Sequence, residues 1–201
     1  MVEGQTVELI VDDELTTVAF ELSSGYNFVS LSALPDEADS CQLILNLNRT
    51  SDGTISKLGR FESGRFEVTS YNTDIESPVV GDCFPVVPGR GYVVFTPDAT
   101  TSTYAGYDLV EPAPVSFDSA GWHLIGVNGG AKSYTAVTLI DSIDSEGTIN
   151  VDNVTEWSRA ASRYSGVQKT DDVVYGFDFP INVDRGYFVL VKEGQGTWVP
   201  E

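Results

Sequence analysis

The strongest constraint on the fold is an internal duplication, because one hydrophobic pattern occurs twice in the chain. The sequence of residues 24–31, SGYNFVSL, aligns with residues 120–127, AGWHLIGV, at an offset of 96. The sequence of residues 84–94, FPVVPGRGYVV, aligns with residues 179–189, FPINVDRGYFV, at an offset of 95. Two matched blocks at nearly the same offset indicate two diverged copies of one unit. A repeat of this kind determines the architecture before any single element is assigned.

Two units of this size can each fold around a core of their own, burying about two-thirds of the unfolded surface. The 201 residues divide near the small polar stretch 98–103, whose composition suits a linker. We therefore predict one unit in residues 1–100 and a second in residues 101–201. Residues 196–200, GTWVP, resemble a flanking strand and are interpreted as the start of a third unit in a longer array.

Each unit is predicted to consist of strands, one short helix and further strands. Residues 25–31 and 121–127 alternate and are rich in β-branched and aromatic types, which is typical of half-buried strands. Helical spacing of apolar residues follows at Leu43, Ile44 and Leu47, and again at Ala136, Leu139, Ile140 and Ile143. The helix N-caps are expected at Asp36 or Asp39 and at Ser133 or Thr135. The predicted fold class is mainly β with a minor α component, as two tandem homologous β-sandwich or barrel-like units, each with one short helix.

Residues 25–31 and 121–127 open the two copies, and residues 88–94 and 183–189 close them. In this arrangement they resemble a repeat class of large secreted and cell-surface proteins of bacteria and archaea. Its units open with a Gly-Trp-Asn-Leu-Ile-Ser-Leu-Pro-like strand and close on Pro-Gly-(Arg/Lys)-Gly-Tyr-Trp-Val. The chain departs from this pattern where Ser32-Ala33 and Asn128-Gly129 replace Pro, and where Val183-Asp184 replaces Pro-Gly. The resemblance implies an extracellular or cell-surface location and an architecture with no reaction attached.

The recurring residues are interpreted as structural anchors of the repeat. Recurrence in both copies indicates core packing for its aromatic members, Tyr26 with Trp122 and Tyr92 with Tyr187. The anchors are Gly25, Tyr26, Arg90, Gly91 and Tyr92 in the first unit and Gly121, Trp122, Arg185, Gly186 and Tyr187 in the second. Trp157 and Trp198 are less constrained by the repeat, and they are the candidates for a glycan-binding platform.

The charge of the chain restricts its partners. Thirty acidic residues against 11 Lys and Arg give a formal net charge of −19, which repels nucleic acid and anionic membranes. No apolar run approaches the roughly 18 residues that a membrane span requires. Cations, a high-salt medium or simple solubility remain as reasons for the acidic surface.

The sequence predicts no enzyme and no catalytic residue. His123 is the only histidine, so it would have to be the general base of any Ser-His or Cys-His arrangement. It aligns with Asn27, and a position that accepts both residues is interpreted as an exposed strand position. Histidine-based zinc sites and phosphate-binding glycine loops also lack their required residues.

Cys41 and Cys83 belong to the first unit only, and a spacing of 42 without a Cys-x-x-Cys motif fits one disulfide or two reduced thiols. In an extracellular protein, we expect the disulfide. Two sequons, at Asn48 and Asn153, permit N-glycosylation without requiring it.

Calcium is the one cofactor that the acidic clusters suggest, at residues 36–39, 141–146 and 171–172. An EF-hand loop with Gly147 at its sixth position would begin at Ser142 and end at Asn153, neither of which supplies the required carboxylate. An ordinary turn is therefore favoured, and no cofactor is assigned.

These observations predict a non-enzymatic structural, spacer or adhesion-associated repeat module of an extracellular surface protein, with neighbouring domains or repeats as partners. Two alternatives stay open. One is a module that binds a glycan or a protein surface. The other is a subunit of a filament or sheath, in which residues 7–11 add a strand to a neighbouring unit.

Overall fold

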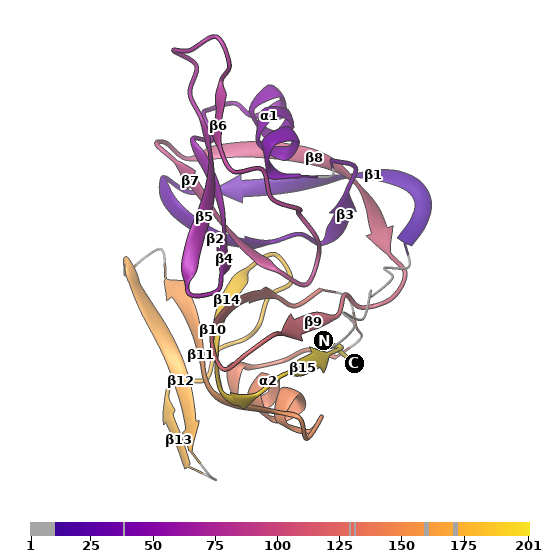
Figure 1. The fold of residues 1–201 in the computed structure, drawn as a ribbon, viewed down its shortest axis with the longest axis vertical. Helices are drawn as coiled ribbons and strands as arrows, with labels where there is room; N and C mark the ends of the chain where they lie inside the picture. The colour runs from indigo at the N-terminus through magenta and orange to yellow at the C-terminus, as the bar shows by residue number, and fades with distance from the viewer. Residues whose placement is uncertain (1–10, 38, 129, 131, 159–160, 171–172) are drawn as a thin grey trace.

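The computed structural model describes residues 11–201 except residues 38, 129, 131, 159–160 and 171–172. Figure 1 shows two units stacked along the long axis of the molecule, each combining strands with one helix. The prediction of a mainly β fold with a minor helical component is confirmed. Most of the segment proposed for strand addition, residues 7–10, lies outside the described residues.

The first unit contains a five-stranded antiparallel sheet in the order β2-β7-β4-β5-β6. A second sheet has the order β1-β8-β3, and α1 packs against β8 of this sheet and against β4 and β5 of the first. The bounds are β1 Val11–Leu22, β2 Gly25–Ser30, β3 Ala33–Pro35, α1 Ser40–Thr50, β4 Lys57–Glu62, β5 Arg65–Tyr71, β6 Val79–Gly81, β7 Gly91–Thr96 and β8 Thr100–Leu109.

The second unit repeats this topology. Its five-stranded sheet has the order β10-β14-β11-β12-β13, which is the order of the first sheet strand for strand, and β15 pairs with β9 as β8 pairs with β1. The bounds are β9 Val115–Phe117, β10 Gly121–Gly126, α2 Ala136–Asp144, β11 Ile149–Ser158, β12 Arg163–Thr170, β13 Val173–Gly176, β14 Gly186–Gly194 and β15 Gly196–Trp198.

Both helices lie where the apolar spacing predicts them, and both bury that apolar stripe. Leu43, Ile44 and Leu47 of α1 are at most 1% exposed. Asp39 caps α1, because its carboxylate accepts hydrogen bonds from the backbone N–H groups of Cys41 and Gln42 at 2.9 and 3.0 Å. Thr135 caps α2 in the same way. Of the predicted alternatives, these two residues are the caps.

The closing block is held by a buried tyrosine in each unit, as predicted. The hydroxyl of Tyr92 accepts a hydrogen bond from the backbone N–H of Val87 at 2.7 Å. The hydroxyl of Tyr187 accepts the equivalent bond from Asn182 at 2.7 Å. Both tyrosines are fully buried, and each ring stacks on the phenylalanine that begins its block. The tyrosine therefore fixes the tight turn that leads into β7 or β14.

The pairing of β8 changes where the first unit ends. Thr101 pairs with Glu21 of β1, and at the equivalent positions Gly196 pairs with Phe117 of β9. Strand β8 therefore belongs to the sheet of the first unit, and residues 110–114 connect the units. Strand β15 closes the sheet of the second unit, so the interpretation of residues 196–200 as the start of a third unit is wrong.

Candidate binding site at the junction of the units

The two units meet through reciprocal contacts. Val29 forms an isolated antiparallel bridge with Arg185, and Ile125, the repeat equivalent of Val29, forms one with Arg90, the equivalent of Arg185. Two backbone hydrogen bonds obey the same relation. The N–H of Ser30 donates to the carbonyl of Asp184, and the N–H of Gly126 donates to that of Gly89, each at 3.1 Å. Contacts that are exchanged between equivalent positions are the signature of a two-fold interface, here within one chain.

An apolar cluster lies beside this backbone contact and follows the same symmetry. Its buried members are Phe28, Val93 and Leu124, and three further rings pack on them: Phe61, Trp157 and Phe188. The six residues form three equivalent pairs: Phe28 with Leu124, Phe61 with Trp157, and Val93 with Phe188. The outer faces of the two five-stranded sheets are thus joined by one hydrophobic contact.

Glycines permit the close approach of the two backbones. A β-carbon on Gly91 would lie 2.7 Å from the carbonyl oxygen of Ile125, and one on Gly186 would lie 3.1 Å from that of Val29. The Arg-Gly-Tyr motif therefore carries glycine in both copies because the partner unit occupies the space of a side chain. The requirement for glycine at Gly91 and Gly186 thus comes from the contact between the two units.

Ser30 and Gly126 are equivalent in the repeat, and they face each other at the centre of the junction. A β-carbon on Gly126 would lie 1.9 Å from Oγ of Ser30. The Ser30 hydroxyl instead donates to Oδ1 of the buried Asn128 at 2.8 Å, and the Asn128 amide donates to the carbonyl of Leu31. Only one of the two units can carry a side chain at this position.

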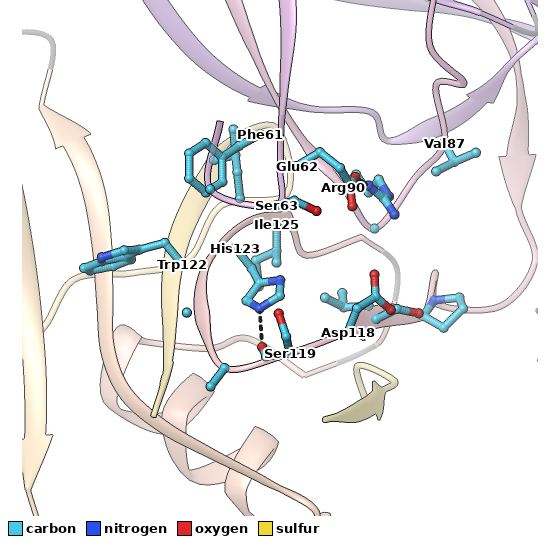
Figure 2. Close-up of a pocket in the computed structure, with 18 of the residues that line it drawn as sticks. Phe61, Glu62, Ser63, Val87, Arg90, Asp118, Ser119, Trp122, His123 and Ile125 are labelled. Atoms are coloured by element: carbon cyan, nitrogen blue, oxygen red, sulfur yellow. Dashed lines mark hydrogen bonds and ion pairs between the residues drawn. The ribbon is translucent and has the colours of Figure 1, made fainter. Parts of the chain in front are cut away.

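A second feature, a cleft of about 660 Å³ with polar and apolar walls, opens on one side of the junction. Figure 2 shows Glu62 and Arg90 of the first unit on one wall and His123, Ser119 and Asp118 of the second unit on the facing wall. Arg90 forms an ion pair with Glu62, the last residue of β4 before the β4–β5 turn. The cleft therefore combines a paired cation, an acid, a hydroxyl and the only histidine of the chain.

The interpretation of His123 as an exposed strand residue is wrong, because the ring is half-buried and lines this cleft. Its Nε2 donates a hydrogen bond to the backbone carbonyl of Ser119 at 2.8 Å, which places the proton of the neutral ring on Nε2. Asn27, its equivalent, is fully buried and donates to the carbonyl of Ser23 at 2.8 Å. Both side chains thus hold the turn that enters the opening strand. Within the described part of the chain, no hydroxyl or carboxylate side chain is bonded to His123.

An aromatic groove of about 490 Å³ lies on another face of the junction, over β2, β7, β4 and β5. Its walls are rings that keep large exposed fractions: 52% for Tyr26, 46% for Phe66 and 50% for Tyr164. Trp157 lies between the units, with its ring centroid 4.9 Å from that of Tyr164 and 6.1 Å from that of Phe28. Burial against these rings raises the pKa of Tyr164.

The charge of this groove differs from that of the chain as a whole. Lys57 is the only charged residue among the 11 that line it, and no carboxylate does so. The Lys57 ammonium lies 6.0 Å from the centroid of the Phe95 ring. No ion pair to Lys57 occurs within the described ranges. The groove therefore offers an unpaired cation on a strongly acidic protein.

The structure reassigns three of the aromatic residues singled out in the sequence. Tyr26 and Trp122 are 52% and 43% exposed, so their assignment to the core is wrong. They recur because both lie on the outer faces of the paired sheets. Trp198 is 1% exposed and its Nε1 donates to Oγ of Ser142 at 3.1 Å, so it cannot form a binding platform. Trp157 does lie in the groove, as the binding alternative requires.

Three groove residues were not singled out from the sequence. Lys57, Phe66 and Tyr164 stand at positions of β4, β5 and β12 whose side chains point away from the cores of the units. Only β5 carried a signal, because it has aromatic side chains on both faces, Phe66 outward and Tyr71 on the core, which a strand with one solvated face does not need. Gly25 and Gly121 have φ of +91° and +128°, so these anchors serve the turn before each opening strand.

Cys41 and Cys83 form a disulfide, which links α1 to the segment before Phe84. At the equivalent position of the second unit, the backbone N–H of Val137 donates to the carboxylate of Asp178 at 3.0 Å. A hydrogen bond thus replaces the covalent link, and the two units close the same contact by different chemistry.

The acidic clusters and one sequon have structural partners. Asp144 accepts a hydrogen bond from the N–H of Val151 at 2.7 Å, and partial burial raises its pKa. Asp141 pairs with Lys169, and Asp171 and Asp172 lie outside the described residues. Asn48 donates from Nδ2 to two backbone carbonyls inside the first unit, so its amide is already engaged.

No protein-family model, curated protein or solved structure matches the chain. The resemblance to the surface repeat class therefore rests on the two sequence blocks alone. Across the described ranges, no helix combines the length and apolarity needed to cross a membrane.

Proposed function

We propose that the chain is a non-enzymatic module of an extracellular or cell-surface protein, in which two repeat units are fixed face to face as one rigid structural body. The reciprocal junction carries this proposal. A flexible pair of spacer units needs only a linker, whereas here the recurring glycines and outer-face rings of both units meet each other.

The disulfide and the surface charge support the location. Disulfides persist in oxidising compartments, and Cys41 and Cys83 are joined in a unit that also has a complete hydrophobic core. The net charge of −19 keeps such a module dissolved and disfavours association with nucleic acid. The aromatic groove favours ligand binding as a second function of the same module.

Rotational tumbling tests the proposal. ¹⁵N relaxation measured in both units should give one common correlation time, because the junction couples their motion. Leu124→Asp places a charge in the apolar cluster, where Leu124 is 5% exposed, and should separate the motion of the two units. Leu15→Asp is the matched control, because Leu15 is 47% exposed on β1. Two different correlation times in the unaltered protein would refute the rigid body.

A further inference from the structure

The aromatic groove lies over the sheet of the first unit, and Trp157 and Tyr164 of the second unit complete its wall. Gly59 in the floor of the groove pairs with Val68, whereas its equivalent Thr155 pairs with Gly166. Lys57 corresponds to Asn153. The two copies of this outer face therefore differ in which strand of the cross-strand pair carries the side chain and in the charge at the position of Lys57. The scaffold accepts either set of residues at these positions.

The rings of the groove exceed what the junction needs. Phe28 and Val93 are buried in the contact between the units, but Tyr26, Phe66 and Tyr164 remain about half exposed beside it. Exposed apolar surface of this kind, gathered in a concavity, is typical of a ligand site. Tyr and Trp side chains also carry a polar group at the ring edge, which can bond a ligand while the ring face stacks on it.

Charge complementarity defines the ligand further. The unpaired ammonium of Lys57 favours an anionic group in a groove that no carboxylate lines. Nucleic acids bind through several cations that neutralise successive phosphates, and this groove offers one cation on a chain of net charge −19. A single carboxylate on an otherwise neutral ligand matches one lysine.

The position of the groove on the sheet favours a sugar over an extended peptide as its ligand. The groove lies on the face of the sheet, and β4 and β5 are paired on both sides, so their backbone groups are not free to bind an extended peptide. Ring faces flanked by hydroxyl and indole N–H groups instead suit a pyranose, which has apolar C–H faces and hydroxyls at its edge. We infer that this groove binds a glycan in which an isolated carboxylated sugar, such as a uronic acid, pairs with Lys57 while neighbouring sugars stack on Tyr26, Phe66 and Tyr164.

Titration with matched oligosaccharides tests this inference by calorimetry and by NMR shifts of the groove residues. The probes are a xylo-oligosaccharide carrying one glucuronate, the neutral xylo-oligosaccharide of equal length, an oligogalacturonate and an oligoglutamate peptide. At least one carboxylated sugar should bind saturably, and Lys57→Gln should weaken it about tenfold or more, the effect of losing one charge-assisted hydrogen bond. The neutral sugar should bind weakly, with an affinity that the same variant leaves unchanged.

Two further variants make the test specific to the groove. Gly59→Thr places a side chain in the floor of the groove, where its β-carbon would lie 3.5 Å from Cγ2 of Val68, and it should abolish binding. Urea unfolding of the same variant checks that it remains folded. Trp122→Ala removes an exposed ring that does not line the groove, and it should leave the affinity unchanged. The inference is overturned if no carboxylated sugar binds, if Gly59→Thr binds as well as the unaltered protein, or if the peptide binds and the sugars do not.

Discussion

The centre of the junction provides a sharp energetic test, because Ser30 and Gly126 compete for one space. In Gly126→Ala the new β-carbon would lie 1.9 Å from Oγ and 2.6 Å from Cβ of Ser30. Overpacking of this kind costs about 1–3 kcal/mol. Displacing the Ser30 hydroxyl also removes its bond to the buried Asn128, which adds about 1 kcal/mol. We therefore expect Gly126→Ala to lower the free energy of unfolding by about 2–4 kcal/mol.

The double variant Ser30→Gly/Gly126→Ala removes the obstructing side chain. It should be no less stable than Ser30→Gly alone, so the coupling energy between the two substitutions should offset the whole effect of Gly126→Ala, about 2–4 kcal/mol. Urea unfolding of the four proteins measures this cycle. Ser30→Gly/Gly53→Ala is the control, because the nearest side chain to Gly53 is Thr100, which Ser30 does not contact. Additive effects of Ser30→Gly and Gly126→Ala would show that the two positions do not face each other.

Three further outcomes follow from the buried groups. The denatured, unreduced protein should contain no free thiol, and replacing Cys41 and Cys83 by Ala should lower stability by about 4 kcal/mol, the chain-entropy effect for a 42-residue separation; two reactive thiols would contradict this. Trp198→Ala should cost about 3–5 kcal/mol and Trp122→Ala less than about 1 kcal/mol in chemical unfolding, since only Trp198 is buried; equal costs would reverse the assignment of the two residues. Burial raises the pKa of three tyrosines to about 12. Folding therefore favours their protonated form, and each tyrosine contributes roughly 2–3 kcal/mol of stability. This contribution is complete below pH 10, the pKa of unfolded tyrosine, and is lost as the pH rises through 12. These tyrosines are Tyr92, Tyr104 and Tyr187. A urea midpoint that stays constant from pH 9 to 12 would contradict that prediction.

Much of the scaffold could be predicted from local pattern. The apolar spacing around Leu43 and Leu139 identifies both helices, because burial of one helical stripe is a local property of the sequence. The closing block identifies Tyr92 and Tyr187 as core residues for the same reason. The cysteine pair could be expected to bond once the two segments were known to be equivalent to Val137 and Asp178, which lie together in the second unit.

The junction could not be predicted, because recurrence does not distinguish a core from a symmetric interface. Both require the same residue type in the two copies, so Tyr26 and Trp122 were assigned to packing that they do not make. The prediction placed β8 in the second unit because its Thr- and Ser-rich start has the composition of a linker, whereas its pairing with β1 joins residues 78 to 98 positions apart in the sequence. Long-range pairing of this kind leaves no local signal.

The reciprocal hydrogen bonds at the junction are the most direct object of measurement. A long-range HNCO experiment on deuterated protein detects scalar coupling through a hydrogen bond. It should show correlations from the Ser30 amide to the Asp184 carbonyl and from the Gly126 amide to the Gly89 carbonyl, each at an N–O distance of 3.1 Å. Finding both pairs establishes the two-fold relation between the units. Finding neither, with both amides exchanging rapidly with water, would contradict it.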